Sequence, residues 1–67
     1  MKIILNNKEE FFDNELLTIN ELLKIKNFTF KMLVIKVNNQ IVKKNEYDST
    51  TIKEGDDVMV LHLISGG

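Results

Sequence analysis

The sequence predicts an α+β fold, in which a mixed sheet of four to five strands carries one main helix packed on one face. Short runs of alternating apolar residues near both ends of the chain are typical of strands. Between them, one segment has apolar residues at helical spacing behind a capping sequence. Asparagine, aspartate and glycine separate the runs, as expected of tight turns. A helix lying across one face of a sheet is an economical way to bury a single apolar stripe.

The chain begins with a predicted hairpin. Residues 1–6 alternate as a strand, with Met1, Ile3 and Leu5 on one face. Residues 6–8 read Asn-Asn-Lys, and asparagine tolerates the left-handed conformation that a tight turn requires. Residues 9–12 then return as the second strand.

Thr18 opens the predicted helix. The sequence Thr-Ile-Asn-Glu at 18–21 is a capping box, in which Thr18 and Glu21 each bind the backbone N–H of the other. Leu17 and Leu22 are spaced for a hydrophobic staple across the cap. Asn27 is the predicted stop. The apolar stripe consists of Ile19, Leu22 and Leu23, with Lys26 next in the series.

The second half of the chain is predicted to be mainly strands and turns. The predicted elements are a strand over 33–37, a turn at 38–39, a short strand at 41–42, one helical turn within 43–48, a turn at 54–57 and a final strand over 58–64. In the turn at 54–57, Gly55 can take a positive φ. The long apolar final strand fits best in the centre of the sheet, parallel to the first strand. This order and placement is the β-grasp arrangement, which is related to ubiquitin.

Length and composition restrict the possible functions. The 67 residues predict a single domain over 1–67, too small for a large internal active site. Nine lysines oppose ten acidic residues, which argues against nucleic-acid binding. The chain has no cysteine and one histidine, so thiolate chemistry and cysteine-based zinc sites are excluded. We therefore expect no enzyme activity, no bound metal or cofactor and no membrane segment. The expected state is a cytoplasmic monomer.

The chain ends in Ser65-Gly66-Gly67 directly after the final strand. Glycine is costly to order, so two terminal glycines contribute little to stability. A tail without side chains, ending in a free carboxylate at Gly67, can instead enter a narrow enzyme channel. We therefore predict a flexible tail over 65–67.

An apolar patch beside this tail is the predicted partner-binding surface. If the helix covers the face of the final strand that carries Val58 and Val60, the alternate residues must lie on the uncovered face. Exposed apolar patches usually mark interaction sites. The predicted patch consists of Ile4, Val34, Met59, Leu61 and Leu63.

Other conspicuous residues are assigned structural roles. We expect His62 at the solvent-exposed end of the final strand, and Asp56 and Asp57 in a turn instead of a catalytic pair. The pair Lys43-Lys44 is predicted to be a solvated corner that could at most meet an acidic partner. Core packing is the predicted role of the four phenylalanines, Phe11, Phe12, Phe28 and Phe30.

Three motifs resemble the ThiS sulfur carriers of thiamine biosynthesis. They are Val-Asn-Asn-Gln-Ile-Val at 37–42, Ile-Lys-Glu-Gly-Asp-Asp-Val at 52–58 and Ile-Ser-Gly-Gly at 64–67. The resemblance covers the whole chain. It departs from the family pattern at Asn39, where glycine is common, at Lys43, where proline is usual, and at Tyr47, often a tryptophan. These departures concern turn detail and leave the tail intact.

The resemblance implies a specific activity. An adenylating enzyme of the ThiF type would use ATP and Mg²⁺ to activate the Gly67 carboxylate. A persulfide donor would then convert it to a thiocarboxylate, which would supply sulfur to a thiazole synthase of the ThiG type. The alternatives are a MoaD-type carrier for molybdopterin synthesis, a ubiquitin-like protein modifier, and an interaction module whose glycines have no role. MoaD-type chains tend to have prolines before the terminal glycines, and residues 61–65 contain none.

Overall fold

The computed structural model describes residues 1–29 and 32–62. The strands are β1 (Lys2–Leu5), β2 (Lys8–Phe11), β3 (Leu17–Thr18), β4 (Leu33–Val37), β5 (Gln40–Val42), β6 (Thr51–Ile52) and β7 (Asp57–His62). The helix α1 spans Ile19–Ile25, and a 3₁₀ turn spans Lys44–Glu46. Among these residues, no helix is both long enough and apolar enough to cross a membrane.

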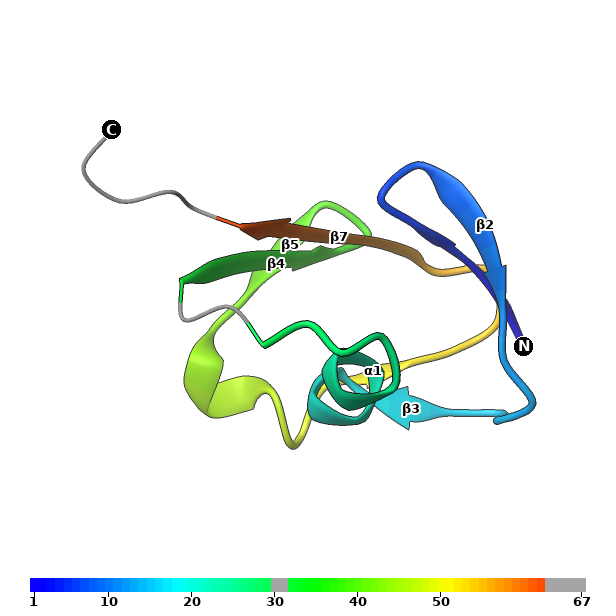
Figure 1. The fold of residues 1–67 in the computed structure, drawn as a ribbon, viewed down its shortest axis with the longest axis horizontal. Helices are drawn as coiled ribbons and strands as arrows, with labels where there is room; N and C mark the ends of the chain where they lie inside the picture. Colours follow the sequence, from blue (N-terminus) through cyan, green and yellow to red (C-terminus); the bar gives the residue numbers. More distant parts are fainter. Residues whose placement is uncertain (30–31, 63–67) are drawn as a thin grey trace.

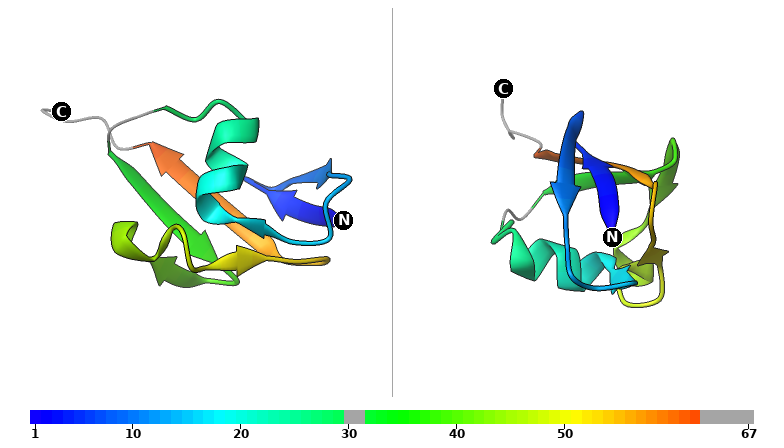
Figure 2. Two further views of the ribbon diagram at one scale, coloured as in Figure 1. Left: turned by 90° about the horizontal axis from the view of Figure 1, so that it is seen from below. Right: turned by 90° about the vertical axis from the view of Figure 1, so that its right-hand side faces the viewer.

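The larger sheet has five strands in the order β2-β1-β7-β4-β5. β7 runs parallel to β1 and antiparallel to β4, so the last strand lies in the centre as predicted. Figure 1 shows α1 on one side of this sheet, and the left view of Figure 2 shows it lying across the strands. The predicted mixed sheet with one helix on one face is confirmed. We call the side that faces α1 the inner face and the other side the outer face.

The core lies between α1 and the inner face. Its most deeply buried side chains come from both layers and from the connections: Ile3, Leu17, Ile19, Leu22, Ile35, Ile52 and Val58. Alternation explains the strand contributions, since Ile3 and Leu5 in β1 and Val58 and Val60 in β7 are buried every second residue. The cap is also as predicted, because Thr18 and Glu21 exchange both hydrogen bonds of the capping box.

Asparagines form the tight turns. Asn6 and Asn7 have φ values of 50° and 68°, and Asn38 and Asn39 have values of 50° and 69°. Two consecutive residues with positive φ are the hallmark of the type I′ hairpin turn, whose twist matches that of the strands. Asn27, with φ of 56°, follows the helix end, and Gly55 has φ of 85°. The predicted turns are therefore confirmed.

Three details differ from the prediction. β3 and β6 form a separate two-stranded antiparallel sheet that the sequence did not indicate. Lys26 follows the helix as its cap and pairs with Glu10 of β2 at 3.0 Å, so the apolar stripe ends at Leu23. Phe11 is 73% exposed instead of packed in the core, because its register opposite Lys2 turns it to the outer face. Phe12 and Phe28 do pack against the core, and Phe30 lies outside the described residues.

Candidate functional site

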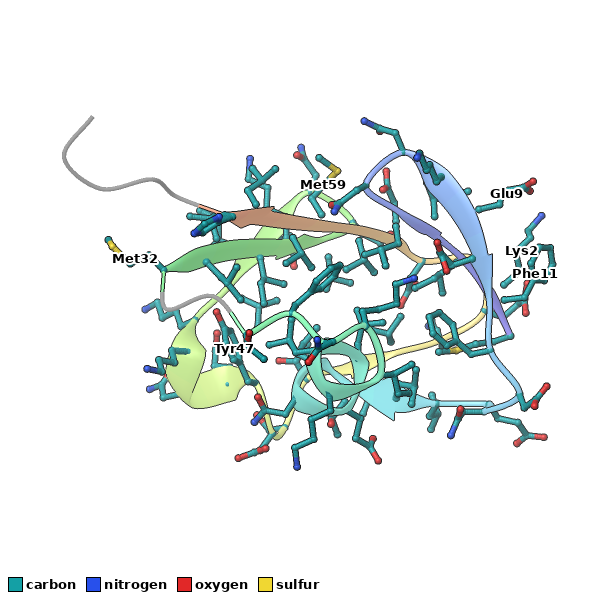
Figure 3. The ribbon with its side chains drawn as sticks, viewed as in Figure 1. Lys2, Glu9, Phe11, Met32, Tyr47 and Met59 are labelled. Atoms are coloured by element: carbon teal, nitrogen blue, oxygen red, sulfur yellow. The ribbon has the colours of Figure 1, made fainter. Side chains whose placement is uncertain are left out.

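The outer face collects the described residues of the predicted partner-binding patch. Val34 lies directly opposite Leu61 across the β4–β7 pair, and residues so paired point to the same side of a sheet. Met59 lies two residues before Leu61 and shares its face, and Figure 3 shows Met59 on the side of the sheet away from α1. Ile4 belongs to this face because its neighbours Ile3 and Leu5 are buried on the inner one.

These residues form an accessible apolar surface. Ile4, Val34 and Met59 are half-buried, and Leu61 is 41% exposed. Leu63, the fifth predicted member, lies outside the described residues. The structure thus brings four of the five residues onto one face, and their role in binding a partner stays a prediction.

Two apolar side chains extend this face beyond the predicted patch. Phe11, 73% exposed, lies on the outer face at the β2 edge, and Ile41, 66% exposed, lies opposite Lys36 at the β5 edge. Sequence reasoning missed both, although alternation gave a signal for Phe11. Adjacent strand residues point to opposite faces, so Phe11 and Phe12 could not both enter the core.

Charged side chains lie at the margin of the apolar surface and within it. Lys2 and Glu9 pair at 3.2 Å on the outer face, and Figure 3 shows them beside Phe11 near β2. Lys36 also lies on this face, opposite Met59, and within the described residues it forms no ion pair. The Lys2–Glu9 pair gives the surface a charged margin, as is common in protein interfaces, whereas Lys36 lies within the surface, between Met59 and Ile41.

β7 is held in place by asparagine side chains on both sides. Asn6 donates its backbone N–H to the Val58 carbonyl at 2.9 Å, and its Oδ1 accepts from the Val60 N–H at 2.8 Å. On the other side, the Asn38 Oδ1 accepts from the Asp57 N–H at 2.9 Å. The Asn38 backbone N–H donates to the Asp57 carbonyl at 2.7 Å. The two turn asparagines therefore fix the strand that leads to the tail, a role that sequence analysis missed.

Asp56 has a structural role. It is 6% exposed, and its carboxylate accepts hydrogen bonds from the Lys53 N–H at 3.0 Å and from the Asn38 Nδ2 at 3.1 Å. The Lys53 bond closes the turn at 54–57 on itself, and the Asn38 bond ties it to the β4–β5 turn. Asp57 is exposed at the start of β7. The turn interpretation of this pair therefore agrees with the structure.

The other residues singled out in the sequence lie apart from the outer-face surface. His62 is exposed at the end of β7, and Lys43 and Lys44 are exposed beside the 3₁₀ turn. Ser65, Gly66 and Gly67 lie outside the described residues. Within residues 1–29 and 32–62, no cluster of three histidine or acidic side chains is placed to hold a metal ion.

Comparisons with known proteins give a consistent result. The model of the ThiS family matches residues 2–67. The crystal structure of a thiamine biosynthesis protein (ThiS) from Geobacter metallireducens is 29% identical, with a TM-score of 0.90 and full coverage of both chains. The solution structure of a thiamine biosynthesis protein from the same organism has a TM-score of 0.80 at the same identity, covering all of this chain and 88% of that one. An uncharacterized protein, ycf40, of Trieres chinensis is 25% identical over 61 residues, which are 91% of this chain and 84% of that protein.

Proposed function

The chain belongs to the ThiS family, and we propose that it is a sulfur carrier in thiamine biosynthesis that works through the Gly67 carboxylate. The observation that carries this proposal is the extent of the family match, which includes the Ser-Gly-Gly sequence at 65–67. The likeness to a solved ThiS protein over the full length of both chains supports it.

The proposed chemistry activates a poor electrophile. A Gly67 carboxylate oxygen attacks the α-phosphorus of ATP, which releases pyrophosphate and leaves an acyl-adenylate. The terminal sulfur of a persulfide donor then attacks the acyl carbon and displaces AMP. A thiol cleaves the sulfur–sulfur bond of the resulting acyl disulfide and is itself oxidised, which leaves the thiocarboxylate. A thiazole synthase of the ThiG type is the proposed acceptor of this sulfur.

The partner enzymes supply the catalytic groups. ATP and Mg²⁺ belong to the adenylating enzyme of the ThiF type, and this chain acts as a co-substrate. Its own contribution is to present the tail from a rigid strand. We propose that the adenylating enzyme docks on the outer face around Ile4, Val34, Met59 and Leu61. Burying these side chains in an apolar contact would position the carboxylate for reaction.

The test uses the full chain with a ThiF-type enzyme, ATP, Mg²⁺, a persulfide donor and a thiol. Intact-mass spectrometry should show one oxygen exchanged for sulfur, and fragmentation should place the exchange on Gly67. Deleting Gly67 should abolish the product with no change in melting temperature, because terminal residues contribute little to folding. A serine added after Gly67 should also abolish it, because the carboxylate would be displaced from the reaction geometry.

Two results would contradict the proposal. If sulfur is not incorporated with a cognate adenylating enzyme, Gly67 is not the working group. If the chain is recovered instead as isopeptide conjugates on lysines of other proteins, it is a ubiquitin-like modifier.

A further inference from the structure

A groove opens between the helix layer and the β4–β5 edge of the sheet, and it borders the outer-face surface described above. It lies between the C-terminal end of α1, the β4–β5 hairpin and the 3₁₀ turn, and its volume is about 640 Å³. Figure 3 shows Tyr47 reaching from the end of the 3₁₀ turn toward the sheet. The part of its apolar lining called here the groove floor consists of Leu23, Phe28, Leu33, Val42 and Tyr47. Met32, Val34 and Ile41 also line the groove, and the last two are shared with the outer-face surface.

The mouth of the groove combines an exposed apolar side chain with positive charge. Met32, just before β4, is 49% exposed and projects outward in Figure 3. Lys43 and Lys44 line the groove from the segment that follows β5, and both are exposed. Among the described residues neither lysine forms an ion pair, whereas Lys2 and Lys26 both do. The charge at this mouth is therefore available to an anionic group.

The groove also lies beside the end of β7. Leu33 of the groove floor is directly opposite His62, the last described residue of the central strand. The outer-face surface borders the same end of β7 from the other side, through the Val34–Leu61 pair. The two surfaces thus meet near the end of the sheet where β7 stops, because Val34 and Ile41 belong to both.

We propose that this groove is a second docking site, which binds an acidic segment of a partner protein carrying a large apolar side chain. The apolar side chain would enter between Leu33 and Tyr47, and carboxylates on either side of it would meet Lys43 and Lys44. Charge complementarity favours this occupant because two lysines without an ion pair among the described residues stand at the mouth and the floor is apolar. Two lysines on a chain of net charge −1 do not provide the extended basic surface that nucleic acids require.

A docking site in this groove includes Val34 and Ile41 of the outer face but leaves Ile4, Met59 and Leu61 outside its lining. A partner held in the groove would lie next to the end of β7 without competing for Met59 and Leu61. The inference concerns binding to the folded chain and does not depend on the carrier chemistry.

The test is a titration of the ¹⁵N-labelled full chain with short peptides, followed by NMR. The probes are acetyl-Glu-Asp-X-Asp-Glu-amide peptides in which X is phenylalanine, tryptophan or leucine, each added to about 5 mM, a range that detects weak binding. Amide shifts should concentrate at Leu23, Leu33, Val42 and Tyr47, and those of Ile4 and Met59 should stay unchanged. Peptides with serine at X, or with glutamine and asparagine in place of the acids, should bind more weakly. Added salt should weaken binding of the acidic peptides.

Matched charge reversals test whether binding depends on a lysine at the groove or only on the net charge of the chain. Lys44→Glu should raise the dissociation constant by about three- to tenfold, because an attraction becomes a repulsion at the mouth. Lys8→Glu makes the same change in net charge at an exposed position in the first hairpin and should have little effect. The proposal is wrong if none of the three acidic peptides shifts the groove amides, if the shifts fall on Ile4 and Met59 of the outer face, or if the two reversals weaken binding equally.

Discussion

Replacing Leu22 by alanine tests the packing of the helix on the sheet most directly. Leu22 is completely buried, in the second turn of α1, and belongs to the core cluster with Ile19, Leu23 and Ile35. Removing three carbons from this position loses their burial and leaves a cavity that the neighbours can only partly fill. Such changes cost about 2–5 kcal/mol.

That loss is large for a chain of this size. At roughly 0.05–0.15 kcal/mol per residue, a 67-residue domain has a free energy of unfolding of about 3–10 kcal/mol. Leu22→Ala therefore removes between a fifth of the stability and all of it. With about 4–8 °C of melting temperature per kcal/mol in domains of this size, the melting temperature should fall by roughly 10–40 °C.

Thermal and urea unfolding followed by far-UV circular dichroism measure the effect, and Ile25→Ala is the matched control. Ile25 lies in the same helix but is 52% exposed, so its truncation leaves little cavity. Alanine is also the better helix former, and the control should stay within about 0.5 kcal/mol of the wild type. If the two variants unfold at the same temperature, the assignment of the buried helix face is refuted.

Three further changes have defined outcomes. Thr18→Ala removes the capping hydroxyl and should cost about 1 kcal/mol in urea unfolding, whereas sulfur incorporation at Gly67 should continue. Asn38→Ala loses the side-chain bond to the Asp57 N–H and puts alanine at a positive φ that asparagine tolerates better, for a cost of about 2 kcal/mol. Asn38→Gly keeps the positive φ available and should cost about half as much, so equal losses would contradict the strain argument. Leu61→Asp should leave the melting temperature nearly unchanged yet weaken binding to the adenylating enzyme in calorimetry, because a charge would be desolvated in the contact. The control Leu16→Asp, at a 57% exposed position outside the sheet, should bind normally.

The main elements of the fold were predictable because their signals are local. The capping box at Thr18 and Glu21 marks the helix start within four residues of sequence. Paired asparagines mark both hairpin turns for the same reason. The central position of β7 followed from its long apolar run. The β3–β6 sheet escaped prediction because two-residue strands are too short to show a period.

The candidate site was predictable only in part. Alternation along β7 placed Met59 and Leu61 on the uncovered face, since the period of a strand fixes which residues share a side. The exposure of Phe11 depends on the register in which β2 pairs with β1. A shift of that register by one residue would turn every side chain of β2 to the opposite face of the sheet. The hydrogen bond from the Val60 N–H to the Asn6 Oδ1 joins residues 54 positions apart, and the sequence around either residue does not predict it.

The clamping of β7 on both sides has a mechanical consequence. A pull along the strand at its C-terminal end loads the hydrogen bonds to β1, β4 and Asn6 in shear. These bonds lie across the direction of the force, so they share the load and must yield together, whereas a peeling force would break them one at a time. An enzyme could therefore draw the chain beyond His62 into a channel under tension without unravelling the domain that carries it.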